Sequence, residues 1–203
     1  YDPNENNTLS TGTVMCFEKY GDEILIGTDG GPDGGEYGLN IMRPNKEGKG
    51  INFEHVEFPD SFMDRTNNFQ SVWDICRESS NVYWLASNFG LIKATRYQQR
   101  WSYEQFMIPN QSVLRKIFID EHGNMWIGSY SGLFFWPWQA RRDNELKFYQ
   151  YSTGDREFVS GNISKPELDL IVTDIMLDSK QRFWISTLNG GLYLLKNKYA
   201  TLN

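Results

Sequence analysis

The feature that most constrains this chain is an internal repeat that occurs four times. Its clearest copy is Asp120–Leu133, which reads DEHGNMWIGSYSGL. Three copies are anchored on a Trp that is followed by an aliphatic residue, a small residue and Ser or Thr, whereas the first copy has Leu25 in the Trp place. The anchor phrases are LIGT at 25–28, WLAS at 84–87, WIGS at 126–129 and WIST at 184–187. Four copies of so long a pattern predict four equivalent structural units.

The spacing before the anchor is the same in every copy. A residue of the set Lys, Glu or Asp stands six positions before the anchor, Cys or Ile stands three positions before that, and a Gly-Leu pair follows the anchor phrase. The four sets are Cys16, Lys19, Leu25 and Gly38; Ile75, Glu78, Trp84 and Gly90; Ile117, Asp120, Trp126 and Gly132; and Ile175, Asp178, Trp184 and Gly191. In the clearest copy, 120–124 is a tight-turn sequence between two apolar runs, which predicts a β-hairpin.

The period of the repeat indicates the architecture. The anchors lie 59 residues (25 to 84), 42 residues (84 to 126) and 58 residues (126 to 184) apart. A period of roughly 40–50 residues with several short strands per unit is typical of a β-propeller blade. A helical repeat is the alternative, but WIGS and GLFFWP at 132–137 combine β-branched and aromatic residues with Gly and Pro, which helices tolerate poorly. We therefore predict an all-β chain of four-stranded antiparallel β-propeller blades.

We predict a single β-propeller segment over 1–203, with four consecutive blades at about 11–58, 71–106, 112–151 and 170–203. The last blade is expected to be incomplete, because only strands 171–177, 183–187 and 192–196 fit before the chain stops and 152–169 is interpreted as a polar connection. The chain starts at Tyr1 without a Met, so we expect an excised piece of a larger propeller. Other blades of the parent protein, or a second copy of the chain, are expected to cover its apolar end faces.

Composition argues against two classes of partner. A net charge of −6 and a pI near 5.0 argue against a nucleic acid, because binding to phosphates needs concentrated Lys and Arg. No apolar stretch has the length that crosses a bilayer, so we expect no membrane contact by this segment. We interpret Cys16 and Cys76 as small buried residues rather than a disulfide.

The repeat resembles the two-component regulator propeller repeat, in which Ile, Asp three residues later, a Gly turn, Trp-Ile-Gly-Thr/Ser and Gly-Leu follow one another. The copy at 117–133 is the nearest match, 175–192 is close, and 75–91 and 16–39 are looser. The resemblance implies the periplasmic sensor region of a Bacteroides-type hybrid two-component histidine kinase that is anchored in the inner membrane and senses oligosaccharides. It also implies a seven-bladed ring, and a segment that is itself no enzyme although its parent is a kinase.

Loop lengths favour one rim of the blades as the binding face. The turns between second and third strands share this rim with the blade-to-blade connections, and the long segments 29–37, 59–70 and 152–169 all lie there. We predict ligand contacts from residues of these rim turns and of one repeat position in the first strands, namely Tyr37, Asn88, Tyr130 and Asn189 and then Asp74, Lys116 and Asp174. The alternative for all seven is structural, because such turn residues need no ligand and charges at strand starts are commonly solvated or mutually paired.

Other chemistry has less support in the sequence. The three anchor Trp residues invite a sugar-stacking role, but their fixed repeat position favours burial between blades. Asp29, Asp33 and Glu36 suggest a cation site, but their loop lacks the ligand pattern of a calcium loop, so we predict no metal and no cofactor. The chain has two His residues, His55 and His122, and no nucleophile elbow, zinc motif or phosphate loop.

Three hypotheses for function follow. The first is a non-catalytic, ligand-sensing propeller segment that detects an oligosaccharide or another small molecule and signals to a cytoplasmic kinase. The second is a structural or protein-docking propeller segment. The third is a carbohydrate-active lyase or hydrolase, because the carboxylate spacing that glycosidase chemistry requires is set by the fold and not by the sequence.

Overall fold

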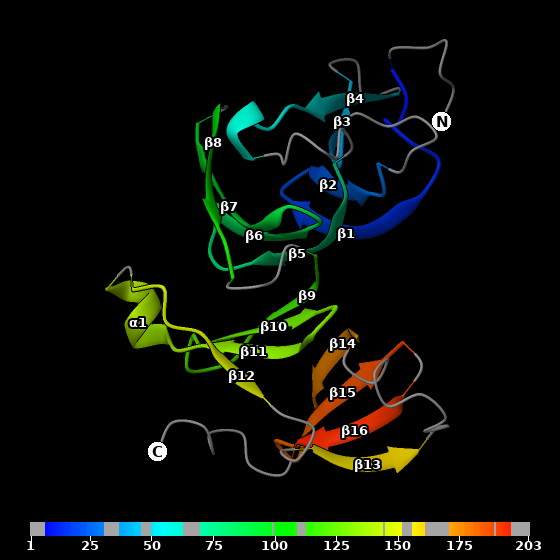
Figure 1. The fold of residues 1–203 in the computed structure, drawn as a ribbon. Coiled ribbons are helices and arrows are strands. Elements are labelled where there is room, and N and C mark those ends of the chain that lie inside the picture. Colours follow the sequence, from blue (N-terminus) through cyan, green and yellow to red (C-terminus); the bar gives the residue numbers. More distant parts are fainter. Residues whose placement is uncertain are drawn as a thin grey trace. The chain divides into compact units, whose positions relative to one another are not determined.

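The chain forms two compact units, Tyr1–Met107 and Ile108–Asn203. The computed structural model describes residues 7–30, 37–45, 50–62, 70–98, 100–108, 113–143, 145–151, 156–160, 171–188 and 190–195. Each unit contains two four-stranded antiparallel sheets, which confirms the predicted blades (Figure 1). That both units form one propeller segment stays a prediction.

Unit 1 contains the first two blades, each of which is a simple meander. The sheet orders are β1-β2-β3-β4 and β5-β6-β7-β8, so every strand pairs with its neighbour in sequence. The strands of the first sheet are β1 Val14–Tyr20, β2 Glu23–Thr28, β3 Leu39–Pro44 and β4 Ile51–Val56, followed by the 3-10 helix η1 Asp60–Phe62. Those of the second are β5 Val72–Arg77, β6 Val82–Ser87, β7 Gly90–Tyr97 and β8 Arg100–Phe106.

Unit 2 contains the third and fourth blades. The third has the order β12-β11-β10-β9, with a short helix between β11 and β12. Its elements are β9 Leu114–Ile119, β10 Met125–Ser129, β11 Gly132–Trp136, α1 Trp138–Arg142 and β12 Tyr149–Tyr151. The fourth blade consists of β13 Arg156–Ser160, β14 Val172–Leu177, β15 Phe183–Thr187 and β16 Gly191–Leu195.

The fourth blade is complete, so the prediction of an incomplete last blade was wrong. Its order is β13-β16-β15-β14, and β13 pairs antiparallel with β16 (Figure 1). An unpaired outer edge would leave the backbone N–H and C=O groups of β16 without partners. The Phe-Val pair within 156–160 favours a strand, which the overall polarity of 152–169 obscured.

The first hairpin differs from the other three by one residue of register. Tyr20 pairs with Glu23 across a two-residue turn in which Gly21 has a φ of 59°. In the second blade, Arg77 pairs with Tyr83 and leaves five residues in the turn. Because the turn lengths differ by an odd number, β1 is shifted by one position, and Cys16 does not occupy the place of Ile75 that the spacing predicted.

The acidic residue six positions before each anchor Trp closes the hairpin and binds the indole. Oδ1 of Asp120 accepts hydrogen bonds from the backbone N–H groups of His122 and Asn124, both at 3.0 Å, while Oδ2 accepts one from the indole of Trp126 at 3.1 Å. Glu78 accepts from Trp84 at 2.7 Å, and Asp178 from Trp184 at 2.9 Å. The first blade has Lys19 and Leu25 at these two places, so it lacks the acceptor and the donor together.

The same contacts act on the charge of Asp178. The hydrogen bond from the indole of Trp184, with further ones from Arg182 and from the backbone of Lys180, holds the pKa of Asp178 well below its usual range. Two of the anchor Trp side chains are almost fully buried, Trp84 at 2% exposure and Trp126 at 0%. Trp126 lies 4.5 Å from the ring of Phe183 in the next blade, which supports the predicted role of this Trp in the core between blades.

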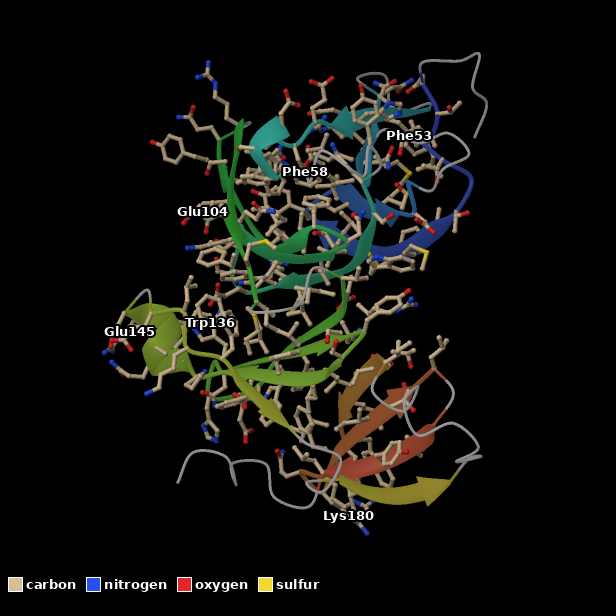
Figure 2. All side chains as sticks on the ribbon, in the orientation of Figure 1. Phe53, Phe58, Glu104, Trp136, Glu145 and Lys180 are labelled. Atoms are coloured by element: carbon tan, nitrogen blue, oxygen red, sulfur yellow. The ribbon has the colours of Figure 1, made fainter. Side chains whose placement is uncertain are left out.

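Within each unit the two blades pack face to face through apolar side chains. In unit 1 a buried cluster joins Leu25, Ile41 and Val72, and Phe58 contacts the rings of Phe89 and Tyr103 at 5.5 and 5.0 Å. Figure 2 shows side chains filling the space around the labelled Phe58. In unit 2 the cluster is made by Trp126, Phe135, Val172, Ile175, Phe183, Ile185 and their neighbours.

The small residue after each anchor aliphatic permits this close approach. A Cβ built on Gly27 would lie 2.6 Å from the backbone oxygen of Val72, and one on Gly128 would lie 2.6 Å from Cγ1 of Val172. Both Val residues belong to the first strand of the following blade. In these two blades the Gly is therefore required by packing against the next blade.

An ion-pair network also joins the two blades of unit 1. Glu23 of β2 accepts hydrogen bonds from Arg96 of β7 and from Arg43 Nε at 2.6 Å, and Arg43 also pairs with Glu54. The Arg96 guanidinium lies over the rings of Tyr20 and Trp101, at 4.7 and 5.3 Å. Burial opposes the charged form of Glu23, but the hydrogen bonds from both arginines outweigh it and lower the pKa of Glu23.

We expect Asp120→Ala to destabilise the protein by about 2 kcal/mol, because the hairpin N–H groups and the buried indole of Trp126 lose their acceptor. Urea unfolding followed by Trp fluorescence measures this change. Glu121→Ala is the matched control, since Glu121 is exposed in the same turn. Equal stabilities of the two variants would contradict the role assigned to Asp120.

We expect Glu23→Gln to lower stability by about 1 kcal/mol at pH 7, because the partly buried carboxylate of Glu23 forms an ion pair with Arg43. The pKa of Glu23 is depressed in the folded state, so its stabilisation is complete above the ordinary value of 4.5 and is lost as the pH falls through the folded-state pKa. The stability difference between wild type and variant should therefore shrink between pH 6 and pH values well below 4.5. Urea unfolding across this range tests this prediction. Glu104→Gln is the control, because the Glu104 side chain on β8 is 61% exposed.

Candidate ligand-binding rim

The candidate rim of each unit consists of the starts of the first strands and the turns between second and third strands. A Ser or Thr closes three of these turns: Ser87 binds the carbonyl of Gly90 at 2.6 Å, Ser129 that of Gly132 at 3.1 Å and Thr187 that of Gly191 at 3.3 Å. The three Gly residues have φ values of 111°, 121° and 90°, which other residues rarely adopt. The Ser or Thr that ends the anchor phrase and the Gly of the Gly-Leu pair therefore fix these three rim turns.

Each first strand carries a β-bulge at the rim. In the third blade Gly128 pairs with Lys116 and Ser129 with Leu114, so Arg115 is the extra residue. The pairings of the other blades leave Met15, Trp73 and Thr173 extra at the same place. Bulges re-aim the side chain of the extra residue and are enriched beside functional sites.

Tyr37 lies at the rim of the first blade, against its outer strand. Its hydroxyl donates to Glu57 at 3.2 Å, and its ring lies 5.3 Å from that of His55, whose Nε2 is 2.8 Å from the carbonyl oxygen of Thr8. The Tyr37 side chain is half-buried. One ring edge and a carboxylate are thus brought together at this position, which suits contact with a polar ligand.

The remainder of the enlarged loop falls partly outside the described residues. Asp33 and Glu36, which suggested a cation site, belong to 31–36 and are not described. Asp29 accepts a hydrogen bond from the hydroxyl of Ser71 at 2.7 Å, and Asp29 and Ser71 form an isolated antiparallel bridge. Among the described residues, no group of three or more His, Cys, Asp or Glu side chains is placed to hold a metal ion.

Asn88 has a structural role in the rim of unit 1. The side-chain oxygen of Asn88 accepts a hydrogen bond from the backbone N–H of Ser71 at 2.8 Å, and the backbone N–H of Asn88 donates to the Ser71 carbonyl at 3.2 Å. The pair of bonds attaches the turn between β6 and β7 to the segment that enters β5. The structural alternative fits Asn88 at least as well as ligand contact does.

Tyr130 is an exposed aromatic residue at the rim of unit 2, with 42% of its surface accessible. The Arg115 guanidinium lies over its ring at 5.7 Å, and Arg115 Nη1 is 3.4 Å from its hydroxyl oxygen. A ring with a cation at one face and solvent access forms a surface on which a sugar ring can stack.

The three charged residues of the first strands do not stand alone. Lys116 Nζ and Asp174 Oδ1 are 3.3 Å apart, and this ion pair joins β9 to β14. Asp174 Oδ1 also accepts a hydrogen bond from the N–H of Ile175 at 2.9 Å. Asp74 is 8% exposed. Burial raises the pKa of Glu18, and the charge of Asp74 contributes in the same direction to a smaller extent. The mutual pairing that the sequence left open is present for Lys116 and Asp174.

Asn189 lies outside the described residues, whereas its neighbour Leu188 is 51% exposed. Cys16 and Cys76 form no disulfide with each other, but both are half-buried and not buried as the sequence predicted. The sequence did not single out the bulged residues Arg115, Trp73 and Thr173. No repeat signal marks them, because their identities differ from blade to blade; the signal lies in the pairing register, which only the structure supplies.

Comparison with known proteins agrees with the fold. Residues 107–131 match the family model described as two component regulator propeller, so the chain carries at least one repeat of that family. No protein with a curated function matches the sequence. Among the described residues, no helix has the length and apolar character needed to cross a membrane.

Solved structures with a similar fold include two extracellular domains of hybrid two-component systems from Bacteroides thetaiotaomicron. One superposes with a TM-score of 0.64 at 15% identity over 95% of this chain and 22% of that one. The other has a TM-score of 0.57 at 18% identity over 97% and 28%. A gluconolactonase from Xanthomonas campestris has a TM-score of 0.56 at 11% identity over 94% and 58%. The chain thus spans about a quarter of the length of the two extracellular domains.

We expect Asn88→Ala to lower stability by about 1 kcal/mol, because the buried N–H of Ser71 loses its acceptor. Thermal unfolding of the variant provides the measurement, and Asn81→Ala in the exposed hairpin at the other end of β6 serves as the control. If Asn88→Ala leaves stability unchanged but weakens ligand binding, Asn88 contacts the ligand instead.

Proposed function

We propose that this chain is a ligand-sensing propeller segment from the extracytoplasmic sensor region of a hybrid two-component system, and that its ligand is an oligosaccharide. The observation that carries the proposal is the match of 107–131 to the two-component regulator propeller repeat, in a chain whose described strands form four four-stranded sheets. The fold similarity to the two extracellular sensor domains supports the same assignment. The parent protein would be a histidine kinase anchored in the inner membrane, and the segment would be periplasmic.

The rim residues supply the chemistry of sugar recognition. Tyr130 presents an exposed ring, and Tyr37 presents a half-buried ring beside the Glu57 carboxylate. Aromatic faces pack on the apolar faces of sugar rings, and carboxylates accept hydrogen bonds from sugar hydroxyls. Asn189, Asn88, Asp74, Lys116 and Asp174 are the further predicted contacts, of which Asn88 and the Lys116–Asp174 pair also have structural partners.

Signalling requires differential affinity. A ligand shifts a conformational equilibrium only as far as it binds one arrangement of the sensor better than another. Contacts shared between blades, such as the Lys116–Asp174 pair between β9 and β14, are places where a ligand can favour one arrangement.

Further blades of the parent protein or a second copy of the chain are the proposed protein partners. Cys16 faces Val72 of β5, so Phe17, which follows it on β1, points to the opposite face and is 66% exposed. Met176 of β14 follows the buried Ile175 and is 54% exposed. These apolar side chains suit coverage by a neighbouring blade.

Two other functions are alternatives to saccharide sensing. A protein-docking segment would bind a partner through the apolar faces of Phe17 and Met176 and no saccharide. A lyase or hydrolase is favoured by the fold that the chain shares with the gluconolactonase, at 11% identity. Turnover of a saccharide that is lost on substituting a rim carboxylate would favour the enzyme.

We expect a panel of oligosaccharides, tested by titration calorimetry on the 203-residue chain, to contain at least one that binds. Tyr130→Ala, Tyr37→Ala and Asn189→Ala should each weaken its affinity by about tenfold, because a stacked ring or a hydrogen bond at a desolvated site contributes roughly 1–3 kcal/mol. Tyr97→Ala is the matched control, since Tyr97 is 75% exposed in the hairpin between β7 and β8. Binding with unchanged affinity in all three variants would refute the rim assignment, and absence of binding across the panel would count against saccharide sensing by this segment.

A further inference from the structure

At the end of the blades opposite the candidate rim, one connection is longer than its counterparts. The third and fourth strands of the first two blades are joined by 45–50 and 98–99, whereas β11 and β12 of the third blade are joined by 137–148, which contains α1 (Figure 1). The start of α1 is attached to the hairpin turn of the same blade, because the backbone N–H of Trp138 donates to Asn124 Oδ1 at 2.9 Å. Enlarged connections on a fixed scaffold commonly carry a binding function.

The indole of Trp138 lies directly against the backbone of this hairpin turn. A Cβ built on Gly123 would lie 3.2 Å from the ring atoms Cδ2 and Cε3 of Trp138. The guanidinium of Arg141 lies over the same ring at 5.1 Å, and its Nη2 donates a hydrogen bond to the carbonyl of Gly123. The turn and α1 therefore hold the indole in one orientation.

Gly123 leaves room for this ring. The turn of the fourth blade has the same form, because the N–H of Gln181 donates to the carbonyl of Asp178 at 2.9 Å, as that of Gly123 does to Asp120. Both residues have a positive φ, 62° for Gln181 and 79° for Gly123. This turn can thus carry a side chain, and in the third blade the side chain is replaced by the indole of Trp138.

Packing uses only part of the indole. Trp138 is 42% exposed, whereas the anchor residue Trp126 of the same blade is fully buried. Glu121 and His122 of the turn that Trp138 contacts are also exposed, and Glu121 Oε1 lies 3.7 Å from His122 Nε2. An apolar ring of fixed orientation is thus accessible to solvent on a turn that carries a carboxylate and an imidazole.

We propose that Trp138, Glu121 and His122 form a second saccharide-binding site, at the end of the third blade opposite the candidate rim. The exposed part of the indole packs on the apolar face of a sugar ring, and the carboxylate and imidazole exchange hydrogen bonds with the sugar hydroxyls. The proposal rests on the proposed function, because it assigns the same class of ligand. Charged groups beside the ring favour a saccharide over a protein partner, since the core of a protein interface is depleted of charged residues.

The test is calorimetric titration of the 203-residue chain with cellohexaose, xylohexaose, mannohexaose and hexagalacturonate. We expect at least one of these saccharides to show a binding event that Trp138→Ala weakens about tenfold or more, because a stacked ring contributes strongly to affinity. Tyr130→Ala at the candidate rim should leave this event unchanged. Trp138→Tyr should retain most of the affinity, because it keeps an aromatic face.

Two further variants separate stacking from folding. Trp138→Leu keeps an apolar side chain against the turn but has no planar ring, so it should lose as much affinity as Trp138→Ala while its thermal unfolding stays near that of the wild type. Leu146→Ala is the matched control, because Leu146 is an exposed apolar residue of the same connection. It should leave the affinity unchanged.

The outcomes distinguish this site from the rim. Unchanged affinity in all Trp138 variants, with weaker binding in Tyr130→Ala, would overturn the second site and leave saccharide sensing at the rim in place. An equal loss in Leu146→Ala would overturn it as well, since the effect would then belong to the connection as a whole. Weaker binding in the Trp138 variants alone would support the second site and count against the rim. Absence of binding by all four saccharides would overturn both proposals.

Discussion

The structure of the second, third and fourth blades depends on a carboxylate placed where a hairpin turns. In the third blade, the two oxygens of Asp120 have separate tasks: Oδ1 holds the backbone of the turn and Oδ2 holds the indole of Trp126. The buried indole N–H would otherwise have no acceptor, and the turn would have unpaired N–H groups. One side chain thus couples local turn formation to the packing of the largest residue in the core. This coupling explains why the acidic residue and the Trp keep a fixed separation of six positions. It also explains why both are absent together from the first blade, where Lys19 and Leu25 need no partner of this kind.

The repeat also explains how much of the fold could be predicted. The fixed phrase specifies a hairpin in every blade and a short rim turn in the second, third and fourth blades, and the structure has both where the sequence placed them. The features that escaped prediction lie outside the phrase. The two-residue turn at Gly21 shifts the pairing of β1 with β2 by one residue relative to the other blades. The spacing of the repeat residues is the same in all four copies, so the sequence does not reveal this shift. The strand β13 pairs with the outer edge of β16, whose backbone groups would otherwise lack partners. This pairing depends on tertiary structure, so the polar sequence around β13 does not predict it.

The candidate site divides in the same way. Of the predicted contacts, Asn88 and the pair of Lys116 and Asp174 have structural partners, although Asn88 follows its anchor phrase at the same place as Tyr130. Tyr37 and Tyr130 lie on turns and contact side chains that the repeat does not fix. Spacing alone could not make this distinction, since hydrogen-bond partners come from other strands and from the pairing register.

This division gives a general way to find a binding surface on a repeated scaffold. Positions that recur describe how the blade is built, whereas a ligand of low symmetry must be recognised by positions that do not recur. The bulge combines a recurring and a non-recurring feature, because its backbone is the same in each blade and its side chain differs. An extra residue in a strand lengthens one edge and tilts the side chain, so the scaffold can present a new group at the rim without altering the pairs on either side. Replacing Arg by Thr at this place changes what the rim presents while Leu114 and Val172 keep the same pairing. The side chain at the bulge therefore changes from blade to blade without a change in the strand pairing on either side.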